Sequence, residues 1–98
     1  MAKFVQIIEY KTKKFDEMQK AADEYRASTE GKRKNGTVLV CRDRDRPDTF
    51  MTIVQFPSYD DAMANNDLPE TAELSQKMMG LADGPPTFYN LDVEREES

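Results

Sequence analysis

The chain has 98 residues, a formal net charge of -5 and a sequence pI near 4.7. This length suits one small domain, residues 1–98, and leaves little room for a second. The negative charge argues against a nucleic-acid partner, because phosphate contacts need a net or clustered positive field. No run approaches the roughly 20 apolar residues of a membrane span, and the start of the chain is too charged for a signal peptide. We therefore expect a cytoplasmic protein with no membrane partner.

Cys41 is the only cysteine, and the chain contains no histidine and no tryptophan. One cysteine excludes an internal disulfide, and no combination of residues suggests a metal-thiolate site. Because Cys41 falls in a strand-like run, we expect a buried thiol in a reducing compartment. We predict no bound metal and no cofactor.

The first predicted strand runs from Phe4 to Tyr10. Strand side chains alternate between two faces, so Phe4, Gln6, Ile8 and Tyr10 share one face, and Val5, Ile7 and Glu9 share the other. Both faces are mostly apolar, although Glu9, like Asp92 in the last predicted strand, is a candidate for general acid or base work if its environment shifts its pKa. The alternative for Glu9 is a position near a strand end, facing water or a lysine.

An amphipathic helix follows the first strand. Phe15, Met18, Ala22 and Tyr25 recur at intervals of three and four residues, which is the spacing of one helical face. We expect the helix to end between Ser28 and Gly31, where polar residues and glycine follow the last apolar position.

Two strands, Thr37 to Arg42 and Phe50 to Phe56, then flank a polar stretch with Pro-Asp turn chemistry, which predicts an antiparallel hairpin. Its arginines, Arg42, Arg44 and Arg46, would share a face if the strand persisted, and that would suit an anionic partner. Interleaved aspartates mostly cancel this field, so we favour a solvated hairpin tip.

The second helical region has clear boundaries. Ser58 is a predicted N-cap, with Asp61 three residues on as in a capping box. The Asn65-Asn66-Asp67 stretch interrupts the region, and Pro69 fits the first turn of a second segment. The two asparagines either end one helix and start the next or direct their amides into a pocket. Gly84 and the prolines after it end the second segment.

The last predicted strand, Thr87 to Val93, places Tyr89, Leu91 and Val93 on one face, opposite Phe88, Asn90 and Asp92. Residues 94–98 form a charged tail that we expect to be frayed. The element order is βαββαβ, which predicts an α+β, ferredoxin-like fold: a four-stranded antiparallel sheet with helices on one face. About eight apolar strand side chains fall on the other face, each worth about 1.5 to 3 kcal/mol when buried, so we predict a homodimer formed through the sheets.

The assembled chain resembles the antibiotic-biosynthesis-monooxygenase-like group of the dimeric α/β-barrel superfamily. The resemblance rests on the stretch Phe56-Pro57-Ser58-Tyr59-Asp60-Asp61-Ala62, continued through Pro69-Glu70-Thr71, and on Phe88 to Val93. These segments match the group's strand, capped short helix, second helix and closing strand. The likeness covers nearly the whole chain and implies a dimeric α/β barrel.

The resemblance implies different chemistry in two branches of the group. The haem-degrading branch relies on Asn, Trp and an axial His at places that fall near Ile8, Ala62 and Glu73 here, so we do not expect haem degradation. Haem held by a tyrosine stays a minor alternative. The cofactor-independent, quinone-forming branch needs polar and aromatic side chains around a polycyclic phenol, which activates oxygen itself.

Seven tyrosine and amide side chains are the candidate ligand-binding residues: Gln6, Tyr10, Tyr59, Asn65, Asn66, Tyr89 and Asn90. An amide buried in a strand needs a partner. For Gln6, Gln55 and Asn90 we favour a hydrogen bond to a neighbouring strand or across a dimer interface, and the alternative is a ligand. Together with these side chains, the resemblance implies a monooxygenase-like protein that binds a small aromatic ligand and oxidises a phenolic or polyketide-like substrate without a cofactor. The alternative is a non-catalytic homodimer that binds or senses a small molecule.

Overall fold

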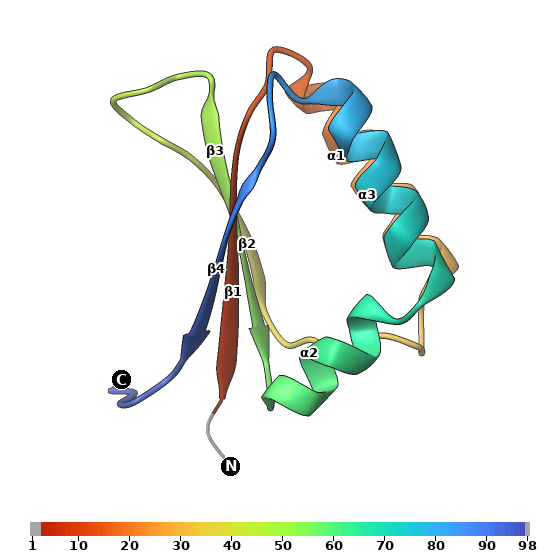
Figure 1. The fold of residues 1–98 in the computed structure, drawn as a ribbon, viewed down its shortest axis with the longest axis vertical. Coiled ribbons are helices and arrows are strands. Elements are labelled where there is room, and N and C mark those ends of the chain that lie inside the picture. The colour runs from red at the N-terminus through yellow and green to blue at the C-terminus, as the bar shows by residue number, and fades with distance from the viewer. Residues whose placement is uncertain (1–2, 98) are drawn as a thin grey trace.

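The computed structural model describes residues 3–97, so Met1, Ala2 and Ser98 lie outside the described residues. The elements in order are β1 Phe4–Lys11, α1 Phe15–Ser28, β2 Val38–Arg42, β3 Thr49–Phe56, α2 Tyr59–Asn66, α3 Pro69–Leu81 and β4 Thr87–Asp92. The predicted βαββαβ order, with the second helical region split in two, is confirmed. Figure 1 shows the sheet as one layer and the three helices as a second layer on one side of it.

The strands form one antiparallel sheet in the order β2-β3-β1-β4. β1 lies inside the sheet and pairs along both edges, so Phe4 has Phe56 on one side and Asp92 on the other. β2 and β4 are the edge strands. This register fixes which side chains of neighbouring strands share a face.

The face of the sheet toward the helices, here the helix face, carries the buried core. Phe4, Phe56 and Ala62 form one cluster at 2 to 4 % exposure, and Val54 and Met63 pack against it. At the other end of the sheet, Phe50 stacks on Phe15 of α1 with ring centroids 4.3 Å apart. The predicted amphipathic helix α1 contributes the buried side chains Met18 and Ala21 to this layer.

Thr12 ties three elements together at one end of the sheet. Its hydroxyl donates to the carbonyl oxygen of Leu81 at 2.8 Å and accepts from the amide of Lys14 at 2.9 Å. Its own amide donates to Asp48 at 3.0 Å. Thr12 is 1 % exposed, so these hydrogen bonds satisfy polar groups that water does not reach.

The helix boundaries follow the predicted caps with one exception. The Ser58 hydroxyl accepts from the amide of Asp61 at 3.2 Å, and Pro69 occupies the first turn of α3, as predicted. The glycine cap predicted for α3 is wrong. Ala82 caps the helix by donating to Met78, and Gly84, with φ of +103°, lies in the turn beyond it.

Within residues 3–97, no helix covers the opposite face of the sheet, here the open face (Figure 1). Alternation places eight apolar side chains on it: Val5, Ile7, Leu39, Cys41, Met51, Ile53, Tyr89 and Leu91. Leu39 is 49 % exposed and Leu91 is 45 % exposed. The expectation of apolar residues on both faces is confirmed.

Cys41 is exposed, so the predicted burial of its thiol is wrong. The thiol lies on an edge strand, and its side of the sheet has no helix over it. Strand propensity indicated the element correctly, but burial depends on what covers the strand. In the part of the chain that the structure describes, no helix is long and apolar enough to cross a membrane.

Replacing Ser58 by alanine removes the cap of α2 and leaves the Asp61 amide without its acceptor. We expect the free energy of unfolding to fall by about 1 kcal/mol, which lowers Tm by roughly 4 to 8 °C in a domain of this size. Thermal denaturation followed by circular dichroism measures this. The control is Ser75→Ala in α3, an exposed serine; an equal loss in both variants would contradict the capping role.

Candidate functional site

A pair of amide side chains lies on the helix face where β1 and β4 run side by side. Gln6 and Asn90 are register partners, and Gln6 Nε2 donates to Asn90 Oδ1 at 3.2 Å. The expectation that mid-strand amides find cross-strand partners is confirmed for this pair. Two polar groups of the pair, Gln6 Oε1 and Asn90 Nδ2, make no hydrogen bond to another part of residues 3–97. The pair therefore offers one acceptor and one donor to a ligand.

Two apolar side chains lie beside this amide pair on the same face. Ile8 lies one same-face position along β1, with Phe88 as its register partner on β4. Phe88 is 54 % exposed, which is unusual for a phenylalanine on a face that carries a core. An exposed ring beside a free donor and acceptor can stack against an aromatic ligand that carries a hydroxyl or carbonyl group.

Tyr10 occupies the helix face at the other end of β1. Its hydroxyl shares a 3.2 Å hydrogen bond with that of Thr52, and its ring stacks near Phe50 with centroids 5.9 Å apart. Burial raises the pKa of Tyr10, and the hydrogen bond to Thr52 opposes this in part. Sequence reasoning missed Thr52, because its role depends on the pairing of β1 with β3 and a lone threonine in a strand gives no signal.

Asn65 and Asn66 have different surroundings at the end of α2. Asn65 Nδ2 donates to Tyr25 Oη at 3.3 Å, and the Tyr25 hydroxyl shares a 2.8 Å hydrogen bond with that of Thr71. Asn65 Oδ1 is buried without a hydrogen-bond partner in the described residues. Asn66 is exposed. The predicted helix break at these asparagines is confirmed, and Asn65 also joins the three helices.

The two remaining candidate residues lie apart from the amide pair. Tyr59 packs edge-on against Phe4, with ring centroids 5.3 Å apart, and is 54 % exposed. Tyr89 lies on the open face, where its hydroxyl donates to Glu9 Oε1 at 3.3 Å. Glu9 also lies 4.0 Å from Arg46. The structure thus places Gln6, Tyr10 and Asn90 on one face and Tyr89 on the other.

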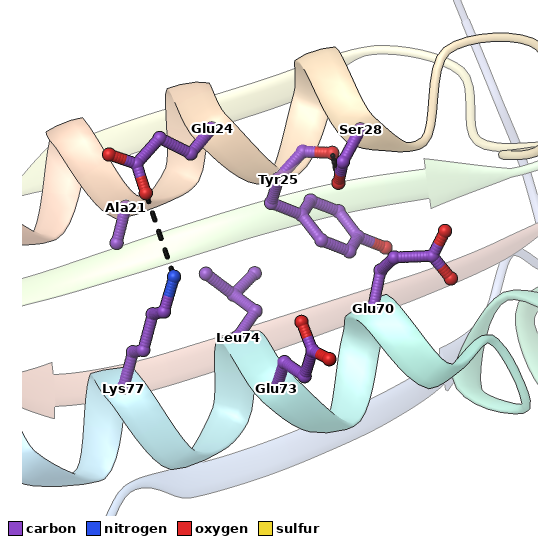
Figure 2. Close-up of a pocket in the computed structure, with 8 residues that line it drawn as sticks. All are labelled: Ala21, Glu24, Tyr25, Ser28, Glu70, Glu73, Leu74 and Lys77. Atoms are coloured by element: carbon purple, nitrogen blue, oxygen red, sulfur yellow. Dashed lines mark hydrogen bonds and ion pairs between the residues drawn. The ribbon is translucent and has the colours of Figure 1, made fainter.

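A separate hollow of about 150 Å³ lies between α1 and α3. Figure 2 shows it in the groove between the two antiparallel helices, with the strands behind them. Tyr25 and Leu74 form its apolar part, and its carboxylates include Glu24, which pairs with Lys77 at 3.6 Å. Lys32 pairs with another lining carboxylate, Glu70, at 2.7 Å and lowers its pKa. These ion pairs neutralise most of the charge in the groove.

Within residues 3–97, no three side chains of the kinds that ligate metals gather into one group. The sequence matches no protein-family model and no curated protein. Solved structures do match. A Caulobacter crescentus protein, whose name gives antibiotic biosynthesis monooxygenase as a provisional assignment, superposes with a TM-score of 0.82 at 13 % identity, covering 96 % of this chain and 92 % of that one.

Two further solved structures share the architecture over nearly their whole length. SnoaB, a cofactor-independent oxygenase from Streptomyces nogalater, has a TM-score of 0.81 at 9 % identity, covering 98 % of this chain and 97 % of that one. A Nitrosomonas europaea protein with the same provisional assignment has a TM-score of 0.78 at 13 % identity, covering 95 % and 91 %. The chain therefore has the ferredoxin-like fold of the antibiotic-biosynthesis-monooxygenase-like proteins, and the predicted resemblance is confirmed at the level of the fold.

The raised pKa of Tyr10 predicts a dependence of stability on pH. The folded state holds the phenol proton more tightly than the unfolded state. The stability that the protonated Tyr10 contributes is therefore complete below the ordinary tyrosine pKa near 10. It is lost as the pH rises through the pKa of Tyr10 in the folded state. We expect the difference in unfolding free energy between the wild type and Tyr10→Phe to shrink above pH 10. Urea denaturation across this range measures it, and a constant difference would contradict the shift.

Proposed function

We propose that this protein binds a small phenolic compound between the sheet and the helices, at the Gln6–Asn90 pair, and oxidises it with dioxygen without a cofactor. The observation that supports this most directly is the amide pair itself. It has a free donor and a free acceptor on the helix face, beside the half-exposed ring of Phe88. The shared fold with a cofactor-independent oxygenase agrees with the proposal.

The amide pair suits the two states of a phenol. The neutral hydroxyl donates to Gln6 Oε1, while the phenolate or enolate oxygen accepts from Asn90 Nδ2. Hydrogen bonds to a charged oxygen are stronger than those to a neutral one, so Asn90 favours the deprotonated form that reacts with oxygen. Tyr10 and Thr52 supply a second pair of hydroxyl groups on the same face.

The proposed reaction balances with dioxygen as the only oxidant. An activated methylene group of an anthrone loses two hydrogen atoms and gains one oxygen atom, forming a carbonyl, and the second oxygen atom leaves as water. The electrons come from the substrate anion, so the protein has to stabilise that anion and orient the ring.

We also propose that two copies of the chain pair through their open faces. Eight apolar side chains lie on this face, and Leu39, Tyr89 and Leu91 are each more than 40 % exposed. Each large apolar side chain is worth about 1.5 to 3 kcal/mol when fully buried, which is enough to favour a sheet-to-sheet homodimer. The helix face then remains open to ligand.

The catalytic proposal is tested by following oxygen uptake with anthrone and naphthol substrates. We expect uptake with at least one of them, and Asn90→Leu should reduce kcat/KM about tenfold, because one hydrogen bond to a charged group is lost. Gln76→Leu, at an exposed amide of α3, is the control and should keep full activity. Thermal stabilisation by these compounds without oxygen uptake would instead favour a non-catalytic binding protein.

The dimer is tested by placing a charge at the centre of the open face. Ile53 lies between Ile7 and Leu39 on this face, so Ile53→Lys should give a species of 11.3 kDa, while the wild type should sediment at about twice that mass. Ala72→Lys, on the exposed side of α3, is the control and should leave the dimer intact. A wild-type monomer at micromolar concentration would refute the pairing.

A further inference from the structure

Arg42 differs from the other arginines of the β2–β3 hairpin in its position. It is the last residue of β2 and the register partner of Phe50, so it lies on the helix face. Its guanidinium carbon lies 5.0 Å from the centre of the Phe50 ring and 5.9 Å from that of Phe15. These two rings stack with an interplanar angle of 7°, and Phe50 is 2 % exposed. The guanidinium is therefore held over a rigid aromatic platform.

Arg42 makes no ion pair with a carboxylate of residues 3–97. Among residues 3–97, no carboxylate oxygen lies within 4.0 Å of its guanidinium nitrogens. The neighbouring carboxylate of Asp43 accepts from the amide of Asp45 and from the guanidinium of Arg46, which together lower its pKa. Sequence reasoning treated the hairpin arginines as one neutralised group. The structure shows that Asp43 pairs with Arg46, whereas Arg42 has no carboxylate partner among residues 3–97.

An apolar strip continues from Arg42 along the edge of the sheet. Val40 and Val38 precede it on the same face of β2, at 42 % and 44 % exposure. Same-face residues of a strand are about 7 Å apart. A group bound at the Arg42 guanidinium therefore lies next to the exposed side chain of Val40. We call Val38, Val40 and Arg42 the β2 strip.

We propose that the β2 strip binds a small aromatic carboxylate, with the carboxylate on Arg42 and the ring system over the two valines. A guanidinium accepts a carboxylate through two parallel hydrogen bonds, which fixes the orientation of the ligand. The net charge of -5 disfavours general attraction of anions. An anion bound here therefore has to combine the guanidinium with apolar contact, as an aromatic acid does.

This site is separate from the Gln6–Asn90 pair and from the open face. β2 and β4 are opposite edges of the sheet, three strand spacings or about 14 Å apart. The strip lies on the helix face, so pairing of two open faces leaves it accessible. Its occupancy can be measured whether or not the protein oxidises a phenol.

Isothermal titration with 2-naphthoate and with 2-naphthol tests the proposal, because the two probes share a ring system and differ in charge. We expect naphthoate affinity to fall about tenfold in Arg42→Gln, while naphthol affinity is unchanged. Arg44→Gln is the matched control, because Arg44 is exposed on the same hairpin and stacks on no ring of the described residues. Wild-type affinity for naphthoate, but not for naphthol, should fall at high ionic strength.

Equal loss of naphthoate affinity in the Arg42 and Arg44 variants would overturn the proposal, because it would indicate a general electrostatic attraction of the anion to the hairpin and no specific contact with Arg42. Unchanged affinity in Arg42→Gln, or a wild-type affinity independent of salt, would overturn it as well. If Arg42→Gln does not fold, Arg42→Lys keeps the charge and loses the planar fork, and its naphthoate affinity should lie below that of the wild type. Failure of oxygen uptake with anthrones bears on the Gln6–Asn90 site and leaves these results unaffected.

Discussion

Hydrogen bonding of β1 along both of its edges is the constraint on which the rest of the structure depends. Because β1 has β3 on one side and β4 on the other, each of its residues from Phe4 to Glu9 has a register partner on both sides. Phe4 packs beside its register partner Phe56 in the buried core cluster. Gln6 donates to its register partner Asn90 and forms the amide pair. A shift of one residue in this strand would move Gln6 to the open face and Ile7 to the helix face.

The helix layer covers the two inner strands of the sheet better than the two edge strands, so exposed apolar side chains on the helix face lie at the edges. Phe50 and Phe56 of β3 are buried, whereas the same-face residues Val40 on β2 and Phe88 on β4 are exposed. Each edge combines exposed apolar surface with a polar group of different character: neutral amides at β4 and a guanidinium at β2. This difference is the basis on which we propose a phenol at the β4 edge and an aromatic carboxylate at the β2 edge.

Features that depend on local sequence could be predicted, and features that depend on lateral neighbours could not. The alternation of β1 and the Ser58 cap are local patterns, because they involve residues one to three positions apart. The partner of Tyr10, the exposure of Cys41 and the separation of Arg42 from Arg46 depend on strand order and on where the strand ends. No spacing within the sequence specifies those neighbours.

The Thr12 hydroxyl has a consequence for the motions of the molecule. Because it donates to the last turn of α3 and accepts from the residue that precedes α1, neither helix end can open without disturbing the other. Residues linked in this way unfold locally as one cooperative unit. Hydrogen-bonded amide protons near the start of α1, from Met18 onward, and in the last turn of α3 should therefore exchange with solvent at similar rates, although about 60 residues separate them in the chain.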